Sequence, residues 1–399
     1  MTGVRTGADR LVAEEFRRLH GRRVGLICNH TAVESARLVH LADAMHAHPK
    51  VHLVRLFAPE HGIRGEAQDM VGVDHGVDPA TGIEVHSLYG HSVASLTPPP
   101  ETLSDLDVLV FDIQDVGSRY YTFAATMALC MKAAKEAGIP LLVLDRPNPL
   151  GGERIEGGPV EPGFESFVGL YSVPARHGMT VGELALYLAA VEPAYGCTLE
   201  VLEMERWRRR MAFEETGLVW IPPSPNMPTV DTAFVYPGMC LVEGTRLSEG
   251  RGTTRPFEQA GAPWVDGERA RVRLEALFEA HGLGGVTPRP CTFRPVFHKW
   301  AGESCGGLFL HVRDRDRFEP WAVGLLFLKA IHDLWPERFE WRSDAYEFVE
   351  EVPAIDLLIG SDAFSRALAE DRPLAELLEA GRAFSEAFRR HRAEFLLYR

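Results

Sequence analysis

The sequence predicts an α/β protein with a doubly wound, mostly parallel sheet and a second, smaller α+β domain. Two observations predict this fold class. In the first half of the 399-residue chain, short apolar runs alternate with segments of helical periodicity, which is the pattern of βαβ units. After about residue 263, three helical patterns and one strand follow. We therefore expect the first domain to span residues 1–260 and the smaller domain to span residues 261–399.

Five buried strands and three helices are expected in the first domain. Residues 108–111 are a typical strand of large and β-branched apolar residues, with an aspartate at each end. The helix expected at residues 123–137 has a clear end, because Gly138 and Pro140 follow it. The expected strands are residues 22–28, 51–57, 107–112, 141–144 and 198–202. The expected helices are residues 38–46, 123–137 and 180–191.

The other parts of the chain are less regular. Residues 66–89 form a polar insertion rich in Gly, Asp and His, and we expect it to have no regular structure of its own. Residues 222–228 are proline-rich and are expected to pack as a rigid wall. In the smaller domain we expect helices at residues 268–280, 321–334 and 373–395, and a strand at residues 306–312.

A cluster of polar residues comes directly after each of four predicted strands. In open α/β sheets, ligands bind just beyond the carboxyl ends of the strands. If the sheet is parallel, these clusters share one edge, and we expect them to line a cleft. The clusters are Asn29 and His30; Glu60, His61 and Arg64; Asp112, Asp115, Arg119 and Tyr120; and Asp145, Arg146 and Asn148.

The composition argues against several classes of partner. A net charge of −14 and a pI near 5.6 argue against nucleic acid or an anionic membrane as the main partner. No apolar stretch reaches the length of a membrane span. The six cysteines are scattered without a CxxC pair, so we expect reduced thiols. The first ten residues contain no apolar signal core, from which we expect a cytoplasmic protein.

Several familiar active-site motifs are missing. The histidines that could bind a metal are His30, His61, His75, His86 and His91. Their spacing matches no compact ligand motif, so we expect no metal and no other cofactor. No GxGxxG or Walker-type loop is present, which argues against a nucleotide site. Ser118 and Ser248 lack the GxSxG setting of a nucleophile elbow.

A cleft of carboxylates, arginines and tyrosines remains as the candidate site. Glycoside hydrolysis needs one protonated acid for the leaving oxygen and a second group that stabilises or attacks the anomeric carbon. Arginines suit a substrate that carries its own carboxylate. Tyr120, Tyr121 and Tyr171 could stack on sugar rings, although core packing is the commoner role of such residues. The residues alone indicate a hydrolase of a polar, anionic small substrate.

Four motifs resemble those of one known family. They are PEHGIRG at residues 59–65, FDIQDVGSRYYT at 111–122, DRPNP at 145–149, and EGT at 243–245 running on to SEGRGT at 248–253. These motifs resemble those of the NamZ-type exo-β-N-acetylmuramidases and occur in the same order. The likeness covers nearly the whole chain. This glycoside hydrolase family was formerly filed as a domain of unknown function.

The resemblance implies a fold, an activity and a substrate. Family members have a Rossmann-like catalytic domain, a smaller C-terminal domain and an active site in the cleft between them. They release N-acetylmuramic acid from the non-reducing end of peptidoglycan fragments, which implies a glycosidase of cell-wall turnover or recycling here. The partner would be a muropeptide or a related amino sugar, and a homo-oligomer is left open. A cytoplasmic protein would act on imported muropeptide sugars.

The resemblance also implies catalytic residues. By its position in the PEHG motif, Glu60 corresponds to the family's catalytic glutamate, and we expect it to be the general acid. For the second catalytic group we expect Glu243, with Glu249, Asp112 and Asp115 as alternatives. The 2-acetamido group of the substrate is a further candidate for the nucleophile.

The remaining candidates are assigned to substrate binding. Three arginines could bind the lactyl carboxylate: Arg64, Arg119 and Arg251. Four residues could bind the hydroxyls and the acetamide: His61, Tyr120, Asn148 and Asn226. Three carboxylates complete the expected site: Asp112, Asp115 and Glu249. For each residue the alternative is a structural salt bridge or turn contact, and for Asp145 and Arg146 that alternative is favoured.

Other interpretations stay open at this point. The chain could be a hydrolase or transferase of another acidic amino sugar, or a catalytically silent sugar-binding protein that has kept the cleft. The PEHG motif itself could be a polar turn in which Glu60 pairs with Arg64 and has no further role. The stereochemical outcome and the preferred aglycone do not follow from the sequence.

Overall fold

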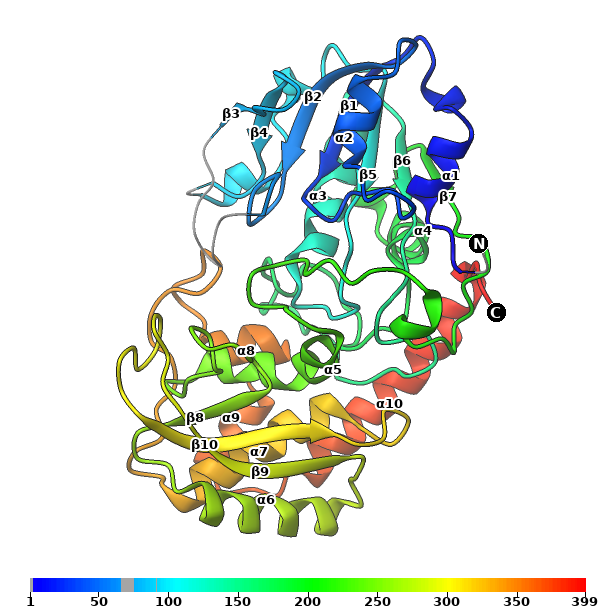
Figure 1. The fold of residues 1–399 in the computed structure, drawn as a ribbon. Helices are drawn as coiled ribbons and strands as arrows, with labels where there is room; N and C mark the ends of the chain where they lie inside the picture. The colour runs from blue at the N-terminus through cyan, green and yellow to red at the C-terminus, as the bar shows by residue number, and fades with distance from the viewer. Residues whose placement is uncertain (1–2, 66–74, 91) are drawn as a thin grey trace.

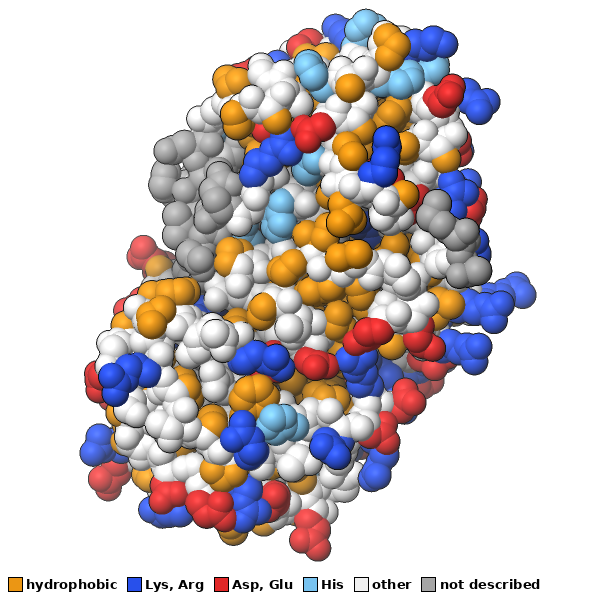
Figure 2. Space-filling view, in the orientation of Figure 1, with side chains coloured by type: hydrophobic (Ala, Val, Ile, Leu, Met, Phe, Trp, Pro, Cys, Tyr) orange, Lys and Arg blue, Asp and Glu red, His pale blue; other side chains and the backbone are white. Residues whose placement is uncertain are grey.

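The structure is a computed structural model that describes residues 3–65, 75–90 and 92–399. Two sheets of unequal size form two stacked units, with helices α5 and α8 between them (Figure 1). The two chain termini lie on the same side of the molecule (Figure 1). On the face shown in Figure 2, hydrophobic side chains gather where the units meet, whereas charged side chains are concentrated on the smaller unit and at the edges.

The larger sheet confirms the predicted fold class. Its strands are β1 Arg23–Cys28, β2 His52–Ala58, β3 Gly76–Val77, β4 Glu84–Ser87, β5 Val108–Asp112, β6 Leu141–Leu144 and β7 Leu199–Leu202. Their order in space is β3-β4-β2-β1-β5-β6-β7, and every neighbouring pair is parallel except β3 with β4. All five strands expected from the sequence are present. Strands β1, β5 and β6 are buried almost throughout, as is usual for central parallel strands, whereas β2 and the edge strand β7 are only partly buried.

The strand order reverses at β1, which has β2 on one side and β5 on the other. Ile27 of β1 is level with Phe57 of β2 and with Phe111 of β5. The three strands therefore end at the same edge of the sheet. Ligands of doubly wound sheets bind at the carboxyl edge next to such a reversal.

The helices cover the sheets and connect the two units. They are α1 Gly7–Ala13, α2 Leu41–His46, α3 Thr122–Ala137, α4 Val181–Val191, α5 Val230–Met239, α6 Gly267–His281, α7 Pro320–Leu334, α8 Ala354–Ile359, α9 Ala363–Ala369 and α10 Ala375–His391. Caps explain several ends. Thr180 and Glu183 form a capping box at the start of α4, and Gly138, with φ 69°, ends α3. The helix expected from residue 38 starts at Leu41, because the extended His40 caps it.

The smaller sheet contains β8 Gln259–Ala262, β9 Val286–Phe293 and β10 Cys305–Val312, antiparallel and in the order β8-β10-β9. The sequence predicts only β10 of these three strands. Pro288 and Pro290 argue against a strand at β9, but β9 lies at the edge of the sheet, where one side needs no partner. Helix α6 packs against β9 and against α7.

Residues 66–89 differ from the expectation of a segment without regular structure. Residues 66–74 lie outside the described part of the chain. The rest contains β3 and β4, and β4 extends the parallel sheet beside β2. A strand of four residues is too short for its alternation to stand out in the sequence. The chain also reaches the smaller unit before residue 260, since α5 packs against α7, and the domain boundary between residues 260 and 261 stays a prediction.

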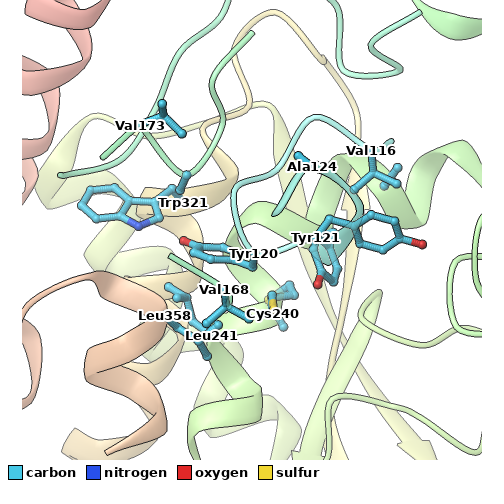
Figure 3. Packing of buried hydrophobic residues seen from close by; sticks show 14 of the residues in the cluster. Val116, Tyr120, Tyr121, Ala124, Val168, Val173, Cys240, Leu241, Trp321 and Leu358 are labelled. Atoms are coloured by element: carbon cyan, nitrogen blue, oxygen red, sulfur yellow. The ribbon is translucent and has the colours of Figure 1, made fainter. Parts of the chain in front are cut away.

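One continuous core joins the two units. It includes Phe111 of the large sheet and Trp321 of α7, and Tyr120 lies beside Trp321 in Figure 3. Helices α5 and α7 approach so closely that no side chain fits between them. A Cβ at Gly324 would lie 2.2 Å from the carbonyl oxygen of Gly238, and a Cβ at Gly238 would lie 1.8 Å from the carbonyl oxygen of Pro320.

We expect Gly324→Ala to lower the free energy of unfolding by about 1–3 kcal/mol or more. Alanine is favoured over glycine in a helix by only about 1 kcal/mol, and the overlap with Gly238 forces α5 and α7 apart. Thermal unfolding measures the change. Gly158→Ala is the matched control, because a Cβ there meets nothing within 4 Å. A melting temperature of Gly324→Ala equal to that of the wild type would contradict the role of this crossing.

Candidate active site

A pocket lies where the loops at the carboxyl edge of the large sheet meet the second unit. Its lining residues come from both units. They are Glu60, His61, Tyr120, Tyr121, Thr122, Phe123, Val168, Ser224, Met227, Tyr236, Glu243, Arg251, Phe257, Tyr346 and Glu347. Three carboxylates, one guanidinium and several phenols therefore share one cavity.

Glu60 lies at the carboxyl end of β2 and is 7% exposed. The two residues after it, His61 and Gly62, have left-handed backbones with φ of 72° and 79°. The sharp turn that results lets both Glu60 and His61 line the pocket. Thr122 Oγ1, at the start of α3, donates a hydrogen bond to Glu60 Oε2 at 2.8 Å. The first residue of α3 therefore holds the carboxylate that the loop after β2 supplies.

Arg64 forms ion pairs with Asp43 and Asp78, whereas the interpretation of the PEHG motif as a polar turn requires a pair with Glu60. Its guanidinium donates to Asp43 and to Asp78 at 2.9 Å each. These bonds tie the loop after β2 to α2, and Arg64 does not line the pocket. The interpretation in which Glu60 serves only as its ion-pair partner is not what the structure shows.

Glu243 and Arg251 line the pocket as an ion pair. Arg251 Nη2 donates to Glu243 Oε1 at 2.6 Å, and the Tyr346 hydroxyl donates to Glu243 Oε2 at 2.6 Å. Burial and the charge of Glu243 raise the pKa of Tyr346 well above its ordinary value, so the phenol keeps the proton that it donates. Both carboxylate oxygens of Glu243 are engaged within the protein.

Glu249 supports this ion pair from outside the pocket lining. Its carboxylate lies 3.3 Å from Arg251 Nε and accepts a hydrogen bond from Lys299 Nζ at 3.0 Å. Burial raises the pKa of Glu249, but Lys299, His298 and Arg251 outweigh burial and leave that pKa below its ordinary value. The ionised Glu249 orients Arg251, and Arg251 in turn orients Glu243.

Aromatic rings form the apolar part of the pocket wall. Tyr121 and Tyr236 pack edge to face with ring centroids 5.6 Å apart, and Tyr236 and Phe257 do so at 4.9 Å. The Arg251 guanidinium lies 4.9 Å from the Phe257 ring centroid. Burial raises the pKa of Tyr121 and of Tyr236 well above the ordinary value, so both phenols stay protonated. Such a wall suits the apolar face of a sugar ring.

The structure divides the predicted site residues into two groups. Those that line the pocket are Glu60, His61, Tyr120, Glu243 and Arg251. Those that do not line it are Arg64, Asp112, Asp115, Arg119, Asn148, Asn226 and Glu249. The second group lies mostly in the interior, where polar groups bond to the protein itself.

Arg119 and Asp112 have structural partners. Arg119 donates to four backbone carbonyl oxygens at 2.8 to 3.0 Å, those of Gly158, Val173, Leu358 and Ile359. Asp112 is fully buried and accepts two hydrogen bonds from Arg146, at 2.5 and 2.9 Å. Buried charges need such partners. We therefore assign both residues a structural role in place of the predicted contact with substrate.

Asn148 and Asn226 are also buried in the protein. Asn148 Nδ2 donates to the carbonyl oxygen of Met179 at 2.9 Å, which stabilises the turn after β6. Asn226 lies in the proline-rich segment 222–228, and Ser224 and Met227 of that segment line the pocket. The sequence predicted the wall but not which of its side chains reaches the cavity.

The sequence did not indicate some of the residues that line the pocket. Thr122 is the last residue of a recognised motif, but its bond to Glu60 depends on how β2 and β5 are placed. Tyr346 and Glu347 come from the segment between α7 and α8, where the sequence shows no motif. A single acidic residue between two aromatic ones is too weak a signal to indicate a site.

Comparison with known proteins identifies the family. Family models described as Exo-beta-N-acetylmuramidase NamZ match residues 24–231 for the N-terminal part and residues 234–398 for the C-terminal part. The chain belongs to the NamZ family. The peptidoglycan beta-N-acetylmuramidase NamZ of Bacillus subtilis (strain 168) is 44% identical over 395 residues, which are 99% of this chain and 91% of that protein.

Two solved structures from Bacteroides fragilis share the fold of this NamZ-family chain. Both are described as DUF1343 family proteins. One has a TM-score of 0.90 and 35% identity, with 100% of both chains covered. The other has a TM-score of 0.76 and 27% identity, with 100% of this chain and 99% of that chain covered. The family resemblance and the fold class that the motifs implied are confirmed.

The part of the chain that the structure describes contains no candidate metal site. No three His, Cys, Asp or Glu side chains gather there in a way that could hold a metal ion. One candidate ligand, His91, lies outside the described residues. The expectation that no metal or other cofactor takes part stays a prediction. None of the described helices has the length and apolar character needed to cross a membrane.

Asp115 makes the stability of the protein depend on pH. Burial raises the pKa of its carboxyl group to about 7, although the backbone N–H groups of Gly117 and Val116 lower it. In the unfolded chain an aspartate has a pKa of about 3.9. Between those two values the folded state binds the proton more tightly, so the contribution of Asp115 to stability falls as the pH rises from about 4 to about 7.

We expect Asp115→Asn, which imitates the protonated acid, to reduce this loss of stability by up to about 4 kcal/mol. Melting temperatures of the wild type and the variant at several pH values between 4 and 8 measure the effect. Asp107→Asn is the control, because Arg23 lowers the pKa of Asp107 to about 2 and its effect lies below this pH range. If the melting temperatures of the wild type and Asp115→Asn depended equally on pH, the raised pKa of Asp115 would be contradicted.

Proposed function

We propose that this chain is an exo-acting glycosidase that releases N-acetylmuramic acid from the non-reducing end of peptidoglycan fragments. The observation that carries the proposal is the position of Glu60, which lines a pocket between the two units of a NamZ-family chain. The name of the Bacillus subtilis relative supports the same activity. The substrate is a muropeptide-derived amino sugar, and the process is the turnover or recycling of the cell wall.

Glu60 acts as the general acid. It donates its proton to the glycosidic oxygen while the bond from that oxygen to the anomeric carbon breaks, and the bonding electron pair leaves with the oxygen. Water then adds its hydroxyl group to the anomeric carbon, and the remaining proton restores the acid. The bond from Thr122 to Glu60 Oε2 holds the carboxyl group in place for this transfer.

Glu243 is the predicted second group, and its place in the pocket lining supports a contact with the substrate. The alternatives outside the lining are Glu249, Asp112 and Asp115. Both oxygens of Glu243 already accept hydrogen bonds, from Arg251 and Tyr346. Glu243 therefore suits the orientation of the sugar better than an attack on it. The acetamido group of the substrate stays the alternative nucleophile.

Arg251 is the preferred ligand for the lactyl carboxylate. Of the three candidate arginines it alone lines the pocket, as far as the described residues show, while Arg64 and Arg119 bind other groups of the protein. A guanidinium has five N–H donors. The bond from Nη2 to Glu243 therefore does not prevent Arg251 from also binding a substrate carboxylate.

Two further predictions concern the protein in the cell. A cytoplasmic protein would act on imported muropeptide sugars, and fractionation of the native producer tests this location. Activity found only outside the membrane would contradict it. The second concerns the oligomeric state, for which a homo-oligomer is left open. Sedimentation of the purified protein measures it.

We expect Glu60→Gln to lower kcat about a hundred- to ten-thousand-fold on a disaccharide capped with N-acetylmuramic acid. The loss should be much smaller on the 4-nitrophenyl glycoside of the same sugar, because nitrophenolate leaves without a proton. Affinity for the sugar should stay close to that of the wild type. Steady-state kinetics with both substrates and calorimetric binding of N-acetylmuramic acid measure these effects.

Glu101→Gln is the control for this experiment, since Glu101 is exposed in the short 3-10 helix Pro100–Thr102 before β5. Its kinetics should equal those of the wild type. Full activity of Glu60→Gln on the disaccharide would reject Glu60 as the acid. A wild-type protein that binds the sugar but hydrolyses neither substrate would instead favour the sugar-binding alternative.

A further inference from the structure

A strained turn between α7 and α8 places Tyr346 and Glu347 in the pocket wall. Two backbone hydrogen bonds between Tyr346 and Val349, at 2.9 and 3.0 Å, close the turn. Within it, Glu347 and Phe348 have φ of 45° and 68°. A left-handed backbone is unfavourable for a non-glycine residue. Two in succession persist only where the surroundings hold them, and such strain clusters at functional sites.

Contacts from both units hold this turn. On one side, the Tyr346 hydroxyl donates to Glu243 Oε2 at 2.6 Å. On the other side, the Tyr89 hydroxyl, which follows β4 of the large sheet, donates to Glu347 Oε2 at 3.0 Å. The Tyr89 ring also packs edge to face on Phe348, with centroids 5.7 Å apart. Glu347 therefore lies where the large sheet meets the wall that carries Glu243.

Glu347 is one of three carboxylates in the pocket lining, as far as the structure describes it, and the other two are Glu60 and Glu243. Only 6% of Glu347 is exposed, and it nevertheless reaches the cavity. Glycine or asparagine would adopt the backbone conformation of this residue more easily than glutamate does. A strained backbone at a carboxylate that lines the pocket indicates a role in function.

The reaction needs a carboxylate beside the acid, because positive charge develops on the sugar in the transition state. Glu60 supplies the proton under the proposed function. Both oxygens of Glu243 are bonded within the protein, and the ion pair with Arg251 offsets its charge. Resting on that proposed function, we propose that Glu347 is a further catalytic residue, whose carboxylate contacts the sugar and stabilises the positive charge at its anomeric carbon.

The proposed role belongs to one step of the reaction. As the proton of Glu60 moves to the glycosidic oxygen and the bonding electron pair leaves with that oxygen, the anomeric carbon and the ring oxygen share a positive charge. A neighbouring carboxylate stabilises this charge more in the transition state than in the bound substrate. Its removal should therefore lower kcat and change KM little.

Glu347→Gln tests this role, because it removes the charge and keeps an oxygen for the bond from Tyr89. We expect kcat to fall about a hundred-fold or more on both the disaccharide and the 4-nitrophenyl glycoside, with KM within roughly threefold of the wild type. The equal loss on both substrates distinguishes Glu347 from Glu60, whose removal should spare the nitrophenyl substrate. Tyr89→Phe should show a smaller loss of roughly tenfold.

Glu350→Gln is the matched control, since Glu350 is an exposed glutamate in the same segment, and its kinetics should equal those of the wild type. A purely structural role of Glu347 would lower the melting temperature of Glu347→Gln and leave kcat of the folded protein unchanged. A kcat within threefold of the wild type on both substrates would overturn the proposal.

Two further measurements separate the remaining outcomes. If Glu347→Gln melts well below the wild type, Glu347→Ala is assayed with sodium formate, a small carboxylate that can fill the space. Recovery of kcat by at least about tenfold supports the proposal, and no recovery overturns it.

The second measurement is the release of N-acetylmuramic acid by the wild type, assayed alongside the variants. No release of N-acetylmuramic acid by the wild type contradicts the proposed function and this inference with it, whereas wild-type turnover with an unaffected Glu347→Gln contradicts this inference alone.

Discussion

The parallel pairing of β1 with β2 on one side and β5 on the other is the constraint on which the pocket depends. Because Ile27 is level with both Phe57 and Phe111, the loops after β2 and β5 begin at one edge of the sheet. There Glu60 and Thr122, 62 positions apart in the chain, form a hydrogen bond. A register shift of one residue would turn the side chains of a strand to the opposite face. It would separate the carboxylate from the hydroxyl that holds it.

The other wall of the pocket depends on the contact between the two units. Helices α5 and α7 cross at glycines, and the segment Cys240–Gly244 that follows α5 brings Glu243 to the cavity. Arg251 then links Glu243 with Glu249, so the charges of this wall are paired within the protein. Groups that are already oriented before the substrate binds need little rearrangement in the transition state, which favours catalysis.

The sequence predicted the sheet, the family and the position of Glu60, because strand periodicity and the PEHG motif are local signals. It did not predict that Arg119 is structural, since its carbonyl acceptors lie 39 to 240 positions away in the chain. A polar residue after a strand can bind a ligand or a buried backbone group, and only tertiary contacts decide between them. Glu347 was missed because two non-glycine residues with left-handed backbones leave no recognisable sequence pattern.

The most direct test of this account is a crystal structure of Glu60→Gln with the intact disaccharide capped with N-acetylmuramic acid. The account predicts that the sugar occupies the pocket between the two units and that the glycosidic oxygen lies within about 3 Å of the side chain at position 60. A disaccharide bound elsewhere on the protein would contradict it. So would a glycosidic oxygen placed beside another carboxyl group and out of reach of position 60.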